Sequence, residues 1–195
     1  MKLTLAVILS LAFTPVAAQD FEIGKAAYYA GDYATALQEW TPLAEAGDVD
    51  AQNWLGAIYS NGDGVLQDYA EALKWYKMAA EAGDVEGQSK LGNRYRLGIG
   101  LPQDDAEAFK WYRLAAVQND ASAQYSIGYM YRNGNGVLQD NVMAHLWLNI
   151  ASANGGELAG RKRDELADSM TPAAIEKAQS MARECMSSGY TECGY

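Results

Sequence analysis

Histidine and cysteine are scarce in this chain of 195 residues, which contains one histidine and two cysteines. The single histidine, His145, excludes a His-x-x-x-His pair and any metal site that needs two histidine ligands. The sequence also lacks Ser-x-x-Lys, the nucleophile motif of serine β-lactamases and penicillin-binding proteins. No Lys-Ser or Lys-Thr follows its glycine-rich segments, so they do not match a phosphate-binding loop. We therefore expect no catalytic residues, no bound metal and no cofactor.

Positively charged residues are also scarce relative to negatively charged ones. The chain has 15 Lys and Arg residues against 25 Asp and Glu residues, for a net charge of −10. An acidic surface repels phosphate backbones and anionic lipid headgroups, which argues against nucleic acid or a membrane surface as the main partner.

Both cysteines, Cys185 and Cys193, lie close to the C-terminus. In an exported protein, a close pair of cysteines favours a disulfide. The alternative is two free thiols on a frayed tail. A shared metal site is disfavoured because His145 lies far upstream of both cysteines.

The N-terminus has the pattern of a secretory signal peptide. Lys2 precedes an apolar run from Leu3 to Phe13, and Ala18 ends a segment of small residues. This run is shorter than the roughly 17–25 residues that span a bilayer, so we expect cleavage after Ala18 rather than membrane insertion. Loss of Lys2 with the signal peptide, residues 1–18, would change the net charge from −10 to −11. The sequence thus predicts a periplasmic or secreted protein.

The segment from Ala51 to Asp84 is the unit that organises the chain, because it recurs twice with a period of 36 residues. A fixed period in this range indicates a stacked repeat array, in which no unit can bury its apolar face alone. The first copy is marked by Leu55-Gly56, Tyr59, Gly62, Gly64, Gln67-Asp68, Ala72, Trp75-Tyr76, Ala79-Ala80 and Gly83-Asp84. Apolar residues at helical spacing within each unit predict an all-α fold.

The predicted units follow one another along the chain. Each repeat should contain a first helix, near Val49–Asn61, Val85–Leu97 and Ala121–Asn133, and a second helix that begins after Asp68, Asp104 and Asp140. A shorter unit precedes the repeats, with helices predicted at about Phe21–Ala30 and Tyr33–Ala46. We assign residues 19–48 to that unit, 49–84, 85–120 and 121–156 to the repeats, 157–187 to a helical cap and 188–195 to a tail.

Three glycines at one register, Gly56, Gly92 and Gly128, fall in the middle of the predicted first helices. Glycine inside a helix costs about 1 kcal/mol relative to alanine, so a compensating contact is expected. The second helix should approach them closely, at Ala72, Ala108 and Ala144 or their neighbours. The tyrosines and tryptophans follow the same period, which indicates core packing and not a cofactor pocket.

These repeats resemble the Sel-1-like repeat, an elongated relative of the tetratricopeptide repeat. The resemblance rests on Leu-Gly-x-x-Tyr, Gly-x-Gly-Val-x-Gln-Asp and Ala-x-x-Trp-Tyr-x-x-Ala-Ala, which occur in Ala51–Asp84. It implies a right-handed α-α superhelix whose first helices line a concave groove. It also implies an adaptor or scaffold that binds a protein or peptide, without catalysis. Cysteine-rich relatives have been described as β-lactamases, so a cell-wall or β-lactam hydrolase is the alternative function. The cysteine pairs of those relatives bridge helical hairpins, whereas Cys185 and Cys193 lie in the tail.

By analogy with tetratricopeptide grooves, residues beside the helical glycines should face the partner. These positions are Lys25, Tyr28, Asn53, Ala57, Ser60, Ser89, Asn93, Arg96, Tyr125, Tyr129 and Arg132, and they differ between units. We expect Arg96 and Arg132, with Lys90 or Arg94, to hold a carboxylate or acidic segment of the partner. The amides of Asn53 and Asn93 would bind its backbone. The alternative is that the arginines pair with neighbouring acids of the chain itself.

Two further interpretations concern isolated groups. Asp63 lies in an Asn-Gly-Asp-Gly run that could suggest calcium, but no Glu follows it at chelating distance, so turn geometry is the simpler explanation. His145 occupies the register of Leu73 and Phe109, which predicts a partly buried helix position. We expect a monomer, with a self-associating array as an alternative.

Overall fold

A computed structural model describes residues 20–193, and this part of the chain is entirely helical. The predicted signal peptide, residues 1–18, lies outside the described residues. The helices are α1 (Phe21–Tyr29), α2 (Tyr33–Glu45), α3 (Val49–Asn61), α4 (Tyr69–Glu81), α5 (Val85–Leu97), α6 (Asp105–Ala116), α7 (Ala121–Asn133), α8 (Asn141–Ala153), α9 (Glu157–Ala167) and α10 (Pro172–Ser187). Among them, none is both long and apolar enough to cross a bilayer.

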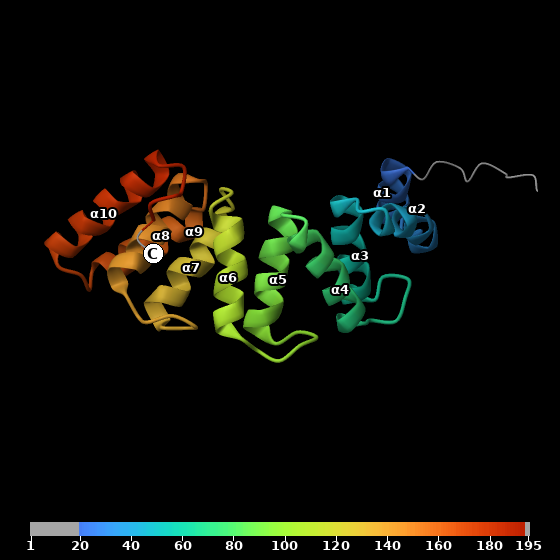
Figure 1. Cartoon of the computed structure of the whole chain (residues 1–195), viewed down its shortest axis with the longest axis horizontal. Helices are drawn as coiled ribbons and strands as arrows, with labels where there is room; N and C mark the ends of the chain where they lie inside the picture. The colour runs from blue at the N-terminus through green and yellow to red at the C-terminus, as the bar shows by residue number, and fades with distance from the viewer. Residues whose placement is uncertain (1–19, 194–195) are drawn as a thin grey trace, which may run out of the picture.

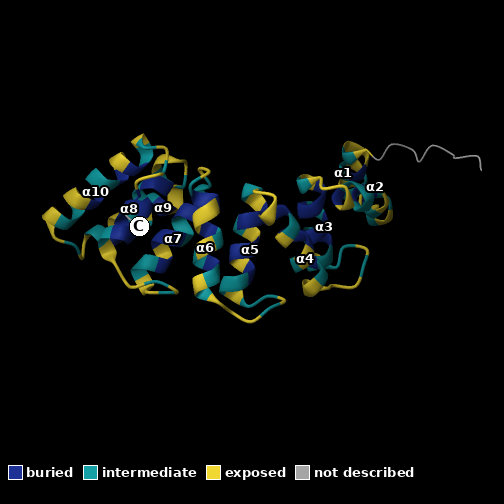
Figure 2. Ribbon diagram, viewed as in Figure 1, coloured by how far each residue is buried: buried dark blue, intermediate teal, exposed yellow. Residues whose placement is uncertain are grey.

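Successive helices pack against each other in chain order from α1 to α9, which makes an elongated α-α solenoid (Figure 1). We call α1, α3, α5 and α7 the A helices, and α2, α4, α6 and α8 the B helices. Each A helix packs on its own B helix, and each B helix also packs on the next A helix. The predicted all-helical solenoid is confirmed. Figure 2 shows that the buried residues follow the sides of the helices that meet their neighbours.

Aspartates begin the A helices of the three repeats. The side chains of Asp48, Asp84 and Asp120 each accept a hydrogen bond from a backbone N–H of the first turn. Each of these A helices ends at a glycine in the left-handed conformation, with φ of 79° at Gly62. A carboxylate stabilises the free amide groups of a helix start, and glycine adopts positive φ without a steric penalty.

The B helices begin at aspartates in the same way. Asp68, Asp104 and Asp140 cap α4, α6 and α8, as the sequence predicts. The backbone N–H of each of the three also donates to a tyrosine carbonyl near the end of the preceding A helix, at 2.8–2.9 Å. The loop between the two helices is therefore fixed to both of them.

The helical glycines make room for a side chain of the B helix in the same unit. A Cβ added to Gly56 would lie 2.7 Å from the ring of Tyr76, and one added to Gly92 would lie 2.8 Å from the ring of Tyr112. At Gly128 the corresponding neighbour is Leu148, at 2.9 Å. The predicted close approach is present. For Gly56 and Gly92 its partner lies one helical turn beyond the expected alanine, because an aromatic ring needs the space that glycine leaves.

A second set of contacts joins each unit to the one before it. Gln52, Gln88 and Gln124 are buried, and each amide nitrogen donates to a carbonyl near the end of the preceding B helix, at 2.9, 3.4 and 2.9 Å. The loop glycine Gly64 lies against Tyr33, so that a Cβ there would be 2.5 Å from the tyrosine Cβ. These contacts recur in the repeats, and they hold neighbouring units in register.

The C-terminal end of the array is closed by α9, α10 and the tail. Both α9 and α10 pack against α8. Thr171 caps α10, with Pro172 in its first turn, as predicted. Cys185 and Cys193 form a disulfide and are both buried. The pairing favoured by the sequence is present, and it holds the tail over the core around α8.

We predict that Gly56→Ala lowers the free energy of unfolding by about 1–3 kcal/mol, because the new methyl group would overlap the Tyr76 ring. The loss would occur although alanine is the better helix former by about 1 kcal/mol. Urea denaturation measures the difference.

The matched control for this substitution is Gly160→Ala in α9, where the new Cβ would meet only the rotatable Ser152 hydroxyl, at 2.9 Å. This variant should be as stable as the parent protein or more stable. Equal effects of the two substitutions would contradict the proposed role of the Gly56–Tyr76 contact.

Candidate functional site

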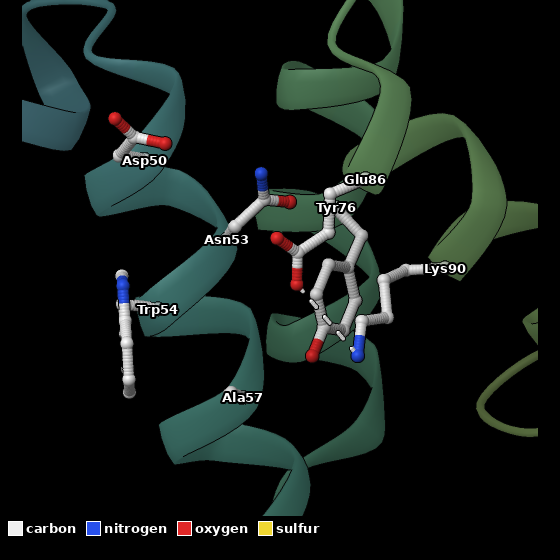
Figure 3. A pocket seen from close by; sticks show the side chains of 7 residues that line it. All are labelled: Asp50, Asn53, Trp54, Ala57, Tyr76, Glu86 and Lys90. Atoms are coloured by element: carbon white, nitrogen blue, oxygen red, sulfur yellow. Dashed lines mark ion pairs between the residues drawn. The ribbon is translucent and has the colours of Figure 1, made fainter. Parts of the chain in front are cut away.

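A row of cavities lies between neighbouring A helices and continues to α9, and we call it the A-helix groove. The cavity between α3 and α5 has a volume of about 250 Å³, that between α5 and α7 about 500 Å³, and that between α7 and α9 about 130 Å³. Figure 3 looks into the first of these cavities, where the ion-paired Glu86 and Lys90 lie beside the Tyr76 ring. The groove is open and lined by both polar and apolar side chains, which suits a surface that contacts another macromolecule.

The residues of the groove change from one repeat to the next, whereas the helical glycines that pack against the B helices recur in each repeat. One register holds Asn53, Ser89 and Tyr125, and another holds Ala57, Asn93 and Tyr129. A third register holds Ser60, Arg96 and Arg132. None of these positions supplies the glycine contact that closes each hairpin, so their side chains can differ between repeats.

Asn53 is used mainly within the array. It is only 7% exposed, and its Nδ2 donates to the Asp84 carboxylate of the next repeat at 2.7 Å. Ser89 makes the equivalent bond to Asp120, at 3.0 Å. This register therefore links one A helix to the N-terminal cap of the next, a role that the sequence did not reveal.

Asn93 and Arg96 meet at one hydroxyl group. The Tyr112 hydroxyl donates to Asn93 Oδ1 at 2.9 Å and accepts from Arg96 Nε at 3.2 Å. Burial raises the pKa of Tyr112, and the neighbouring Arg96 partly opposes this shift. Asn93 is exposed and lines the cavity between α5 and α7, whereas Arg96 is half-buried.

Arg132 lies in a different cavity from Asn93. Together with Tyr125, Tyr129, Leu148 and Lys162 it lines the space between α7 and α9, where Tyr129 is 43% exposed. The pKa of Glu165 is lowered, first by its hydrogen bond from Lys162 and also by the charge of Arg132. Within residues 20–193 neither Arg96 nor Arg132 forms an ion pair, so the alternative of self-pairing with nearby acids is not seen.

Lys25 and Tyr28 belong to α1, at the other end of the groove. Lys25 lies 3.9 Å from Glu22, and Tyr28 packs against Trp54 with ring centroids 4.9 Å apart. The Tyr28 hydroxyl donates to Asp63 at 2.9 Å. Burial and this carboxylate raise the pKa of Tyr28 to about 12. Tyr28 therefore ties the first unit to the loop of the next one, whereas Lys25 pairs within its own helix.

The burial of Arg94 was the feature of the site that was hardest to predict from the sequence. This arginine is only 9% exposed, at a register where the other repeats place Ile58 and Met130 in the core. The sequence feature that could have indicated its burial is a charged residue at a register that is apolar in the other repeats. Arg94 lines a cavity of about 460 Å³ at the loop edge of the groove.

The profile of the Sel1 repeat family matches residues 49–84, 85–120 and 121–156, which together make up more than half of the sequence. The chain is a Sel1 repeat protein. This family points to a scaffold for protein–protein interaction.

Two solved structures are similar to this Sel1 repeat protein. One is the crystal structure of c5321, a protective antigen present in uropathogenic Escherichia coli strains that displays an SLR fold. It is 40% identical with a TM-score of 0.67, over 71% of this chain and 31% of that one. The other is a Sel1 repeat protein from Oxalobacter formigenes, 34% identical with a TM-score of 0.67, over 73% of this chain and 57% of that one.

This chain therefore spans about a third to somewhat over half of the length of these relatives. A comparison with curated proteins finds no match.

The loops of the Sel1 repeats are explained by their own hydrogen bonds. Asp63 accepts from both the Tyr28 hydroxyl and Asn61 Nδ2, at 2.9 and 3.1 Å. Across the described part of the chain, no group of three or more His, Cys, Asp or Glu side chains is placed to hold a metal ion.

His145 is more deeply buried than its register predicted, with 2% of its surface exposed. Its Nδ1 is buried without a hydrogen-bond partner. Burial lowers its pKa below the usual 6.5; the charge of Arg163 acts in the same direction, and that of Asp164 opposes it. The neutral imidazole thus belongs to the packing between α8 and the cap.

We predict that His145→Leu makes the melting temperature less sensitive to acid. A group whose pKa is lowered by folding stabilises the protein above its unfolded pKa, and this contribution is lost as the pH falls through the folded pKa. Between pH 7.5 and 5.5 the parent protein should lose more thermal stability than the variant, as measured by circular dichroism. Parallel losses would contradict this role of His145.

Proposed function

We propose that this Sel1 repeat protein is an exported adaptor, and that the A-helix groove is the surface that binds its protein or peptide partner. The observation that carries the proposal is that residues recurring in the repeats and residues differing between them have different roles. Glycines, tryptophans and alanines that recur in the repeats are used in packing, while the groove is lined by residues that differ from repeat to repeat. A scaffold with one specific partner needs this combination of constant core and variable face.

Two arginines of the A helices favour a partner with an acidic segment. Arg96 and Arg132 carry positive charge in a protein whose net charge is −10, and neither is neutralised by an ion pair in the described residues. Lys162 lies in the same cavity as Arg132, where it is ion-paired with Glu165 at 2.8 Å. Opposite charges across an interface guide association and set the orientation of the partner.

Export is supported by two features of different kinds. The first residues have the pattern of a signal peptide. The disulfide between Cys185 and Cys193 is compatible with an oxidising compartment outside the cytoplasm. We therefore place the adaptor in the periplasm or outside the cell, as a monomer.

A competing surface lies on the B-helix side. A cavity of about 370 Å³ runs along α6, lined by Phe109, Lys110, Arg113, Leu114 and Val117. All of these residues come from α6 and its C-cap residue, Val117. A partner bound there would contact a single element and could not read differences between repeats, so we favour the groove.

We predict that the double variant Arg96→Ala and Arg132→Ala binds its partner at least about tenfold more weakly, because two cations are removed from the groove. The measurement is affinity capture from a cell-envelope extract by the immobilised protein, with quantitative mass spectrometry of the captured proteins. Titration of the leading captured protein then gives the dissociation constant.

The matched control is Lys77→Ala with Lys110→Ala, which removes two exposed cations from the B helices α4 and α6. It has the same net charge as the double arginine variant and should retain capture. If both double variants capture the same proteins as the parent at equal strength, the groove is not the binding surface.

A further inference from the structure

Arg94 places a charge at a core position of the solenoid. The equivalent residues of the other repeats, Ile58 and Met130, are both fully buried. A buried charge is costly unless it is paired, so an arginine at this register needs a counter-charge or another source of stabilisation. Among the described residues, Arg94 forms no ion pair.

The protein stabilises the guanidinium without neutralising it. Arg94 Nη2 donates to the Ser60 hydroxyl at 2.5 Å. The guanidinium carbon lies 5.2 Å from the ring centroid of Tyr76 and 5.7 Å from that of Tyr69. The two rings and the hydroxyl hold the group in one place by cation–π contact and hydrogen bonding, and they leave its positive charge in full.

The remaining donors of Arg94 face the cavity. An arginine carries five N–H donors, and the Ser60 bond occupies only one of them. Neither Nε nor Nη1 is among the buried polar atoms that lack a partner, so both retain contact with solvent. Arg94 lines the cavity of about 460 Å³ together with Lys90, Asn93 and Gln67.

The charge in this cavity suits a group with a single negative charge. Lys90 lies 3.8 Å from Glu86, which partly offsets its charge, so Arg94 supplies the uncompensated one. The planar guanidinium can bind both oxygens of a carboxylate at once. A dianion such as phosphate would be repelled more strongly by a protein of net charge −10.

We propose that Arg94 anchors a carboxylate-binding pocket at the loop edge of the A-helix groove, assisted by Lys90 and Asn93. Its ligand is a carboxylate group of the protein partner, either the C-terminal carboxylate or an Asp or Glu side chain. This inference rests on the proposed function and specifies it. The pocket binds one carboxylate in a defined position, and the residue that anchors it is Arg94 instead of Arg96.

The first test titrates ¹⁵N-labelled protein with small ligands at low salt and follows the side-chain Nε–H signals of the arginines by NMR. The signal missing from Arg94→Met identifies Arg94. The ligands are N-acetylglycine for a terminal carboxylate, N-acetylaspartate N-methylamide for a side-chain carboxylate, N-acetylglycinamide as the neutral control, and inorganic phosphate. Arg163, already bonded to Asp164 at 2.7 Å, is the internal control.

The expected result is a saturable shift of the Arg94 signal with one or both carboxylates, and with at least fivefold weaker affinity for phosphate. Tighter binding of N-acetylglycine would identify a C-terminal carboxylate, and tighter binding of the aspartate ligand a side chain. No saturable shift, an equal shift with the neutral amide, or equal or tighter binding of phosphate would overturn the proposal.

The second test compares Arg94→Met with the parent protein. Methionine occupies this register at Met130, so the variant should fold with an equal or higher melting temperature. Its capture of the partner should fall at least tenfold. Full capture by Arg94→Met, together with loss of capture by the double Arg96 and Arg132 variant, would overturn the pocket and leave the groove intact. Full capture by both would also remove the proposed function.

Discussion

The contact between a glycine of each A helix and a side chain of its B helix is the constraint on which the rest of the structure depends. Gly24 meets Trp40, Gly56 meets Tyr76, Gly92 meets Tyr112 and Gly128 meets Leu148. Without a Cβ, the A helix accepts a large side chain against its backbone, and the hairpin closes tightly. The same geometry in four successive units gives a regular array, and regular stacking leaves the spaces between neighbouring A helices as the groove.

This constraint also separates the residues that maintain the fold from those that are available for binding. The residues that repeat most faithfully are fixed by packing, by helix caps and by the hydrogen bonds of Gln52, Gln88 and Gln124. Specificity can therefore reside only where the repeats differ. In the middle of the array those differences include a buried cation, Arg94, and an exposed amide, Asn93. Arg94 thereby adds a positive charge at the loop edge of the groove, in a protein whose net charge is −10.

The regular features of the fold were predictable from the sequence. Periodicity, capping aspartates and terminal glycines each have a local cause, so the A helices of the three repeats begin and end at the predicted residues. The cysteine pair was also foreseen. Individual side-chain partners were harder to predict. Asn53 looks like a surface amide, but it is buried because Asp84 of the next repeat lies opposite it. Arg94 looks like an ordinary cation near a helix end. Its burial is made possible by the rings of Tyr69, at the start of α4, and Tyr76, further along the same helix.

The central claim is that the partner lies in the A-helix groove. Site-specific photo-crosslinking tests it most directly, with a benzophenone amino acid at Ser122 in the cavity between α5 and α7, or at Leu114 in the cavity along α6. Both positions are exposed, so neither substitution should disturb the core. We expect the captured partner to crosslink to the Ser122 position and not to the Leu114 position. Crosslinking from Leu114 alone would contradict the account.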